Sequence, residues 1–343
     1  MKKISLKKKD NKVKKTEREK VEERREEVLA RGRKFKYPLQ YAKHRLVVVT
    51  IIVAVVAVIL LTVVGWFALY KVQDTSDVMY RLTQVLPVQV ASVDGEGVRY
   101  SDYLMIYNST IIPVEQQQGK LGNDDDSNAM RAHYKRLALD EAEDYAFALK
   151  MGRELGIKIT EEMVDQAYDE HRKIGGTERS EESFKKILQD NFGLSEQEYR
   201  RMLYLSLMES AVAQKMDTEA EKIAGQVEQL LKEKNNDLME VAKVLGDKVV
   251  YEETGGLVDK MNVDGGRASE AMKLEQGQVS GKFVSGNGDG YYIVKLIEKT
   301  DTAVNYASIK IPFTVFKSKL KEMRNGDQIK EYIDLPREEN GNF

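Results

Sequence analysis

The longest uninterrupted apolar stretch of the chain is Leu46–Tyr70, where 25 residues pass without a charged side chain. A helix of that length spans about 37 Å at about 1.5 Å per residue, enough to cross a bilayer core with some tilt. Val and Ile are weak helix formers in water, but backbone polar groups in lipid have to be satisfied within the segment. The pattern predicts one transmembrane helix over residues 46–70, with Trp66 and Tyr70 in the interfacial zone.

Charge is distributed unevenly around this helix. Of the 54 Lys or Arg and 56 Asp or Glu, 18 and 7 lie in residues 1–45, which leaves 36 and 49 for the rest. The positive-inside bias predicts a basic cytoplasmic tail over 1–45, a single pass through the plasma membrane and an extracytoplasmic remainder. A nucleic-acid arm is disfavoured because the basic stretch runs directly into the apolar one. A cleaved signal peptide is disfavoured because its apolar region would be shorter, about 7–15 residues.

After the apolar stretch, the spacing of apolar residues becomes that of a strand and then that of helices. Val88–Val93 is rich in β-branched residues and ends at the turn signal Asp94-Gly95, after which Ser101 is expected to cap a helix. Thr160 and Ser195, each followed by glutamates, predict two further helix starts. Apolar residues three and four apart define three amphipathic helices. These residues are Met130, Tyr134, Leu137, Tyr145 and Leu149; Met163, Ala167 and His171; and Tyr199, Leu203, Leu207 and Ala211.

No metal site or cofactor is predicted. Residues 119–128 hold three consecutive aspartates, but the spaced ligands and closing Glu of a calcium loop are missing, so the segment is interpreted as a loop before a helix. The chain has no Cys, which excludes disulfides and thiol catalysis. No hydrolytic triad or phosphate-binding glycine loop is recognisable.

The order of elements carries a resemblance to a known family. The segments are Val90–Gly95, Val98–Tyr103, Leu155–Met163, Phe184–Leu188 and Leu194–Tyr199. Together they resemble the N-terminal chaperone region of the SurA, PrsA and PpiD group of extracytoplasmic foldases. The resemblance implies an all-α chaperone domain over 87–216 that binds unfolded or nascent exported polypeptides through broad apolar surfaces. Other partners it implies are membrane lipid and the translocon, with no nucleic acid.

Residues 217–320 change to an α+β pattern, and 321–343 are expected to form a C-terminal tail. Two helices are predicted from Ala220, Ile223, Ala224, Val227 and Leu231, and from Leu238, Val241, Ala242 and Leu245. Strands are predicted at 249–251, 257–258, 283–284 and 291–297, and Asn287–Gly290 is a hairpin signal.

This second region resembles the parvulin prolyl isomerases, most specifically in Leu274–Ser280 and Gly290–Lys295. Parvulins carry one histidine on the first strand and one on the last. The last-strand position here is Tyr292, and the chain's histidines, His44, His133 and His171, lie elsewhere. By the resemblance, Met272, Phe283 and Tyr292 are the candidate peptide-binding residues.

The expected first strand is absent before Thr218, whereas residues 304–311 look like that strand placed after the last one, with Ser308 at the histidine position. A turn at 299–303 would let it pair antiparallel with 291–297. Either this is a permuted parvulin, or the strand is unrelated. The main functional hypothesis is a membrane-anchored chaperone or foldase whose isomerase domain lacks both histidines. The alternatives are an active prolyl isomerase and a structural envelope protein.

Overall fold

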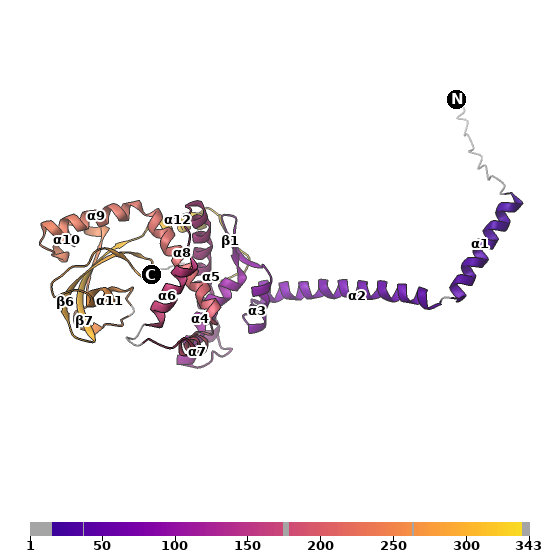
Figure 1. Ribbon diagram of the computed structural model, residues 1–343, viewed down its shortest axis with the longest axis horizontal. Coiled ribbons are helices and arrows are strands. Elements are labelled where there is room, and N and C mark those ends of the chain that lie inside the picture. Colours follow the sequence, from indigo (N-terminus) through magenta and orange to yellow (C-terminus); the bar gives the residue numbers. More distant parts are fainter. Residues whose placement is uncertain (1–15, 37, 174–177, 263, 338–343) are drawn as a thin grey trace, which may run out of the picture. The chain divides into compact units, whose positions relative to one another are not determined.

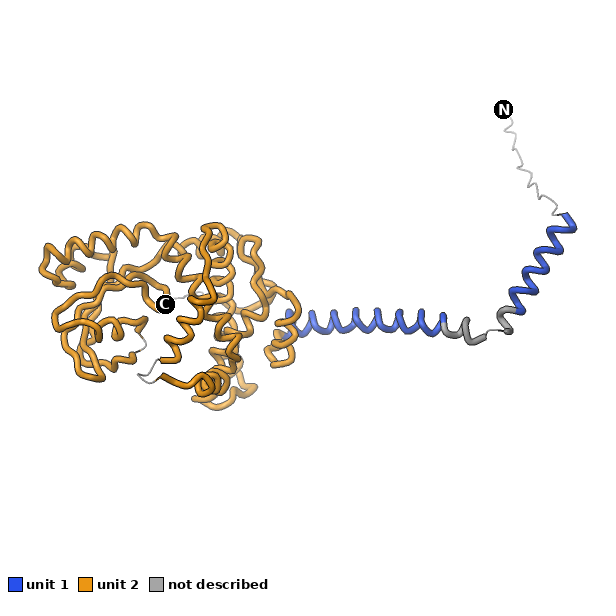
Figure 2. Tube along the Cα trace, viewed as in Figure 1, with its two compact units in different colours: residues 1–72 blue, residues 73–343 orange. Residues whose placement is uncertain are grey.

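The computed structural model describes residues 16–36, 38–173, 178–262 and 264–337. The first 15 residues of the predicted basic tail and the end of the predicted C-terminal tail lie outside these ranges. The chain divides into two compact units, residues 1–72 and 73–343, which are coloured separately in Figure 2.

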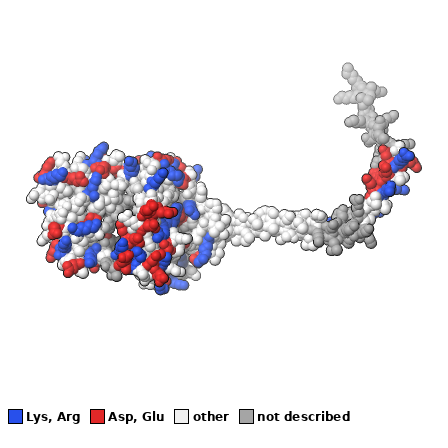
Figure 3. Space-filling model, viewed as in Figure 1, with Lys and Arg blue, Asp and Glu red and all other residues white. Residues whose placement is uncertain are grey.

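The first unit consists of helices. α1 (Glu17–Lys36) is followed by α2 (Pro38–Phe67), which runs into a π-helical turn at Ala68–Val72. Within the described residues, one helix is long and apolar enough to cross a membrane, and it covers His44–Val72. Its two threonine hydroxyls are satisfied internally, since Thr50 Oγ1 donates to the Leu46 carbonyl and Thr62 Oγ1 to the Val58 carbonyl, both at 2.9 Å. The predicted span 46–70 lies inside this helix, and Figure 3 shows the uncharged surface along this part of the chain.

The second unit opens with a helix and a hairpin. α3 (Asp77–Val85) leads to strands β1 (Gln89–Val93) and β2 (Glu96–Arg99), which pair antiparallel. Asp94 and Gly95 both have positive φ, as the predicted turn requires. The predicted cap at Ser101 is wrong. α4 (Tyr100–Gln118) begins directly after β2, because Tyr100 is fully buried and its N–H donates to the Val88 carbonyl.

Four further helices complete the helical region: α5 (Asp125–Glu154), α6 (Glu161–Arg172), α7 (Glu181–Phe192) and α8 (Glu196–Met216). Thr160 and Ser195 cap α6 and α8 as predicted, and Ser195 forms a full capping box with Glu198. α5 packs against both α4 and α8. Gly152 permits the close α5–α8 approach, since a Cβ there would lie 2.4 Å from the sulfur of Met208.

The C-terminal part contains a small antiparallel sheet. α9 (Thr218–Glu233) and α10 (Leu238–Leu245) precede β3 (Val250–Glu253), β4 (Val258–Asp259), α11 (Arg267–Met272), β5 (Phe283–Val284), β6 (Gly290–Lys299) and β7 (Ala303–Pro312). The order is β3-β7-β6-β5, with β4 also paired to β7. The antiparallel pairing of 304–311 with 291–297 is thus confirmed.

Helices cover both faces of this sheet. On one face, α11 places Ala268 and Ala271 against Val294 and Leu296 of β6. Because side chains alternate along a strand, the fully buried Ile293 points to the other face, where α9 and α10 pack (Figure 1).

The C-terminal segment is not the tail predicted for 321–343. α12 (Val315–Asn325) packs on α8, and β8 (Ile329–Glu331) pairs antiparallel with β1. The helical region therefore contains a three-stranded sheet, β2-β1-β8, and is not all-α. Its third strand comes from the far end of the chain, because β1 has an edge whose backbone groups β8 satisfies.

Candidate functional site

The two positions predicted to replace the parvulin histidines lie on one face of the sheet. Tyr292 of β6 is opposite Lys310 of β7, and Val294 is opposite Ser308. Directly opposed residues share a face, and positions two apart along a strand do too, so Tyr292 and Ser308 are diagonal neighbours. This is the face that α11 covers, since Val294 belongs to the α11 cluster.

Tyr292 is covered by its neighbours. Only 4% of its surface is exposed, and its ring stacks on Phe283 with 6.2 Å between ring centroids. The Arg267 guanidinium lies 5.1 Å and the Lys310 ammonium 5.8 Å from the ring centroid. Aromatic rings attract cations in this geometry, so the arrangement holds both basic side chains over the ring.

Carboxylates bind the Tyr292 hydroxyl and the two basic side chains that lie over its ring. The Tyr292 hydroxyl donates to Asp289 Oδ2 at 3.3 Å, Lys310 pairs with Asp289, and Arg267 pairs with Glu252. Burial and the neighbouring Asp289 carboxylate raise the pKa of Tyr292, so the phenol stays neutral. The face that carries Tyr292 is therefore closed by a charged cluster.

Ser308 is buried in the sheet. It is 1% exposed, and its hydroxyl finds no hydrogen-bond partner within the described residues. An unpaired buried hydroxyl costs free energy, so a serine at this position contributes neither an acid–base group nor stability.

The structure brings the three predicted peptide-binding residues to one cluster. Met272 and Phe283 are partly buried and pack against the apolar core beneath α11, and Phe283 carries the stacked Tyr292 ring. Met272 and Phe283 therefore keep some accessible surface, whereas the Tyr292 ring has almost none.

A groove of about 380 Å³ lies on the other side of β6, where Tyr291 points. It is formed at the ends of α8 and α9 and by the segment after α5. Its apolar surface comes from Ile157, Ala211 and Tyr291. Its polar lining comes from Gln214, Lys215, Thr218 and Glu221.

Hydrogen bonds and ion pairs fix the walls of this groove. Gln214 Nε2 donates to the Tyr291 hydroxyl at 3.2 Å, and the Lys282 ammonium lies 5.1 Å from the Tyr291 ring centroid. Lys282 also pairs with Glu221, which lowers the pKa of that carboxyl. The groove thus offers an apolar floor, an amide and charges of both signs, a combination suited to an extended peptide.

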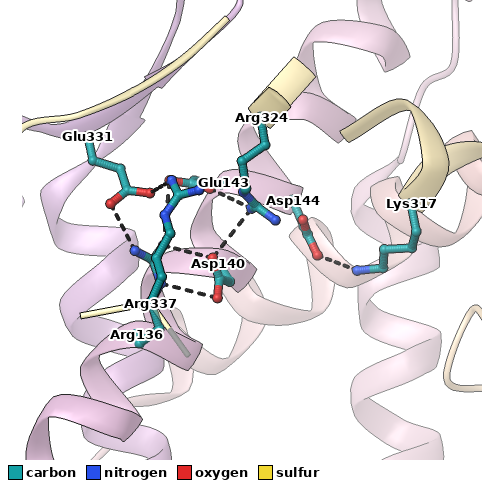
Figure 4. Close-up of polar contacts among 8 residues, drawn as sticks. All are labelled: Arg136, Asp140, Glu143, Asp144, Lys317, Arg324, Glu331 and Arg337. Carbon is teal, nitrogen blue, oxygen red and sulfur yellow. Dashed lines mark hydrogen bonds and ion pairs between the residues drawn. The ribbon is translucent and has the colours of Figure 1, made fainter. Parts of the chain in front are cut away.

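A second polar cluster holds the C-terminal segment to α5, as Figure 4 shows. Arg136 of α5 contacts Asp140 at 2.7 Å and Glu331 of β8 at 2.8 Å. Arg324 of α12 contacts Glu143 at 2.8 Å. Close by, Lys317 of α12 pairs with Asp144 and contacts Glu209 of α8 at 3.2 Å.

The acidic groups of this cluster differ in their protonation. Burial raises the pKa of Glu143 to about 7 despite its ion pair with Arg324, and burial raises the pKa of Asp144 to about 6. Burial opposes ionisation at Glu331 as well, but the hydrogen bond from Arg136 keeps the pKa of Glu331 below its usual value. This cluster is structural, since its members bind one another across α5, α12 and β8.

Within the described ranges, no group of three or more His, Asp or Glu side chains is arranged to hold a metal ion. His171 Nδ1 is hydrogen-bonded to the Tyr199 hydroxyl at 2.5 Å within the packed α6–α8 contact, and burial lowers the pKa of His171.

Sequence reasoning missed the groove and the polar cluster. Gln214, Lys215 and Glu221 are ordinary polar residues at helix ends, and no spacing marks them as a set. The one available signal for the cluster was the set of acidic residues Asp140, Glu143 and Asp144 on the same helix face as Arg136. Their partners lie about 180 residues further along the chain.

Comparison with known families gives one match. Residues 40–213, half of the chain, match the family model described as SurA-like N-terminal domain. The match begins just before the apolar helix and ends within α8. No curated protein matches the sequence.

Proposed function

Because the chain belongs to the SurA-like N-terminal domain family, we propose that it is a membrane-anchored chaperone that binds unfolded exported polypeptides outside the cytoplasm. The family match over residues 40–213 carries this proposal. The apolar helix His44–Val72 supplies the anchor, and the helical region supplies the client-binding body. Nascent chains leaving the translocon are the natural clients of a protein held at that place.

The orientation follows from charge. With 18 basic and 7 acidic residues in 1–45, the tail belongs on the cytoplasmic side. Protease added to the outer face of the membrane should digest the chain after Lys71 and leave the tail intact. Protection of the C-terminal part would overturn both the orientation and the extracytoplasmic role.

The groove beside Tyr291 is the proposed client contact. It combines apolar side chains with groups that can bond a peptide backbone, and burial of client side chains would supply affinity at about 25 cal/mol per Å². Such contacts carry little sequence preference, which suits a chaperone. Met272 and Phe283 are a second proposed contact on the opposite face of the sheet.

The test uses the full chain in lipid nanodiscs and a chemically unfolded protein that aggregates on dilution. We expect the chain to suppress light scattering in a concentration-dependent manner. Ile157→Asp places a charge on the apolar floor and should weaken suppression, whereas Val244→Asp, an exposed valine of α10 outside the groove, should leave it unchanged. Equal suppression by both variants would show that clients do not bind in this groove. No suppression by the unmodified chain would overturn the chaperone proposal.

The sheet domain is proposed to be a permuted parvulin fold that no longer catalyses isomerisation. The long β6–β7 pairing and the shared face of Tyr292 and Ser308 support this. Prolyl isomerisation needs a desolvated pocket that twists the amide over a barrier of about 18–20 kcal/mol. A face closed by Arg267, Lys310 and Asp289 offers no such pocket.

A further inference from the structure

α3 carries an exposed apolar stripe that nothing in the described part of the chain covers. Val78 is 71%, Leu82 38%, Val85 83% and the following Leu86 44% exposed. At about 100° per residue these four positions fall on one side of the helix. The exposed pair Asp77–Arg81, 3.3 Å apart, lies along one edge of the stripe.

The opposite side of α3 is fixed to the body of the unit. Tyr80 and Thr83 are buried, and both the Tyr80 hydroxyl and the Gln84 amide donate to Glu198 Oε1 at 2.6 Å. Glu198 is itself part of the capping box of α8. These contacts fix the orientation of α3 on the helical region, so its apolar stripe faces away from that region.

The position of α3 in the chain limits where this stripe can be. Asp77 follows Val72, the last residue of the apolar span, by five residues, which reach at most about 18 Å when fully extended. The interfacial zone on each side of a bilayer core is itself about 5–8 Å thick. Hydrogen bonds also hold the start of the segment between Val72 and Asp77. Gln73 Nε2 donates to the Asp334 carbonyl at 2.7 Å, and Lys135 Nζ donates to the Gln73 carbonyl at 2.9 Å.

We infer that α3 lies on the outer surface of the membrane, with Val78, Leu82, Val85 and Leu86 in the interfacial layer and Arg81 at the lipid phosphates. An exposed apolar stripe beside a basic residue is the pattern of a helix that lies in that layer. This inference rests on the proposed membrane anchor. The contact of α3 with lipid would be a second attachment of the chain to the membrane. The lipid surface is the occupant because the anchor keeps α3 within reach of it.

The absence of Cys allows single labels to be placed in the full chain, reconstituted in liposomes. Fluorescence is measured without quencher, with a lipid-borne quencher at headgroup depth, and with a water-soluble quencher. The test label is an environment-sensitive dye on Val85→Cys. The matched control is Val244→Cys, another exposed valine, on α10 at the opposite end of the unit (Figure 1). Val55→Cys, inside the span, reports on the anchor itself.

We expect the label at Val85→Cys to shift to the blue and to lose fluorescence with quencher, while the label at Val244→Cys does neither. If the dye in the span is protected from water-soluble quencher but the label at Val85→Cys behaves like the one at Val244→Cys, the docking of α3 is overturned and the anchor stands. If the dye in the span is as accessible to water-soluble quencher as the label at Val244→Cys, the anchor fails, and the docking fails with it.

Discussion

The helical region and the sheet domain use charged side chains in different ways. In the helical region, Arg136 and Glu143 are buried and, together with the half-buried Arg324, hold the C-terminal segment to α5. In the sheet domain, the half-buried Arg267 and Lys310 close the face around Tyr292 over an apolar core. The first arrangement makes one rigid body from distant parts of the chain, and the second removes an open site while leaving the fold intact.

The surfaces of the two regions differ as well. Figure 3 shows acidic side chains gathered over α6, whose exposed residues include Glu161, Glu162, Asp165 and Glu170. Elsewhere on the visible face of the unit the two signs are mixed. An acidic face repels anionic lipid headgroups, which agrees with a body that meets the membrane through α3 and not through α6.

The largest effect is expected from breaking the buried cluster. Arg136→Ala removes the buried cation that Asp140 and Glu331 share. Glu331 keeps its pair with Arg337, and the partly exposed Asp140 keeps Arg324 at 3.4 Å, so the expected loss lies at the lower end of about 3–5 kcal/mol. Arg81→Ala is the matched control, because it breaks an exposed Arg–Asp pair of the same i,i+4 type, worth about 0–1 kcal/mol. Urea unfolding measures both free energies. Similar losses would contradict the structural role given to the cluster.

The protonation of Glu143 should make stability depend on pH. Its pKa is about 7 in the folded chain and near 4.5 when unfolded, so the folded state binds the proton more tightly. Its contribution is fully present below pH 4.5 and is lost as pH rises through 7, a change of about 3 kcal/mol. The half-buried His171, whose pKa is lowered by partial burial, acts in the opposite direction on acidification.

The comparison of Glu143→Gln with the unmodified chain isolates the contribution of Glu143 protonation to the free energy of unfolding. The difference in unfolding free energy between the two proteins should change between pH 8 and pH 5, with the unmodified chain gaining relative to the variant as pH falls. A difference that stays constant over this range would show that Glu143 does not titrate there.

A smaller effect is expected at the junction of the two regions. Asp217 is 2% exposed, caps α9 through Ala220 N–H at 3.0 Å and accepts from the Thr314 N–H at 2.7 Å. Asp217→Ala should cost about 2–3 kcal/mol, as expected for a lost cap together with an unsatisfied N–H. Asp237→Ala, which removes the exposed cap of α10, is the control and should cost about 1 kcal/mol. Equal losses of stability in the two variants would show that Asp217 does not link the two regions.

The smallest effect concerns Ser308. Replacement by Ala removes a buried hydroxyl without a partner in the described chain, so Ser308→Ala should raise stability by up to about 1 kcal/mol. Ser308→His should destabilise the domain by about 1–3 kcal/mol, because it forces a larger side chain into a buried position. A loss of stability in Ser308→Ala would indicate a hydrogen bond at this position.

Much of the fold is local and could be predicted. The apolar run at 46–70, the caps Thr160 and Ser195, and the antiparallel pairing of 304–311 with 291–297 each depend on neighbouring residues or one short turn. β8 could not be predicted, because the three residues Ile329–Glu331 show no period and pair with a strand about 240 residues earlier. The start of α4 was missed because burial of Tyr100 outweighs the capping preference of Ser101.

The candidate site was predicted only in part. Resemblance pointed to Tyr292 and Ser308, and the strand register places both on one face of the sheet. The closure of that face could not be foreseen, since Arg267, Asp289 and Lys310 come from three separate segments whose contacts depend on the sheet register.

The central claim is that the chain holds unfolded polypeptides without isomerising them. The most direct measurement is the refolding of a protein limited by one proline isomerisation, a step of about 10–100 s at 25 °C, in the presence of the full chain in nanodiscs. We expect substoichiometric chain to leave the slow rate unchanged, and excess chain to delay recovery and reduce aggregation. Acceleration of the slow phase by substoichiometric chain, or indifference at every ratio, would contradict the account.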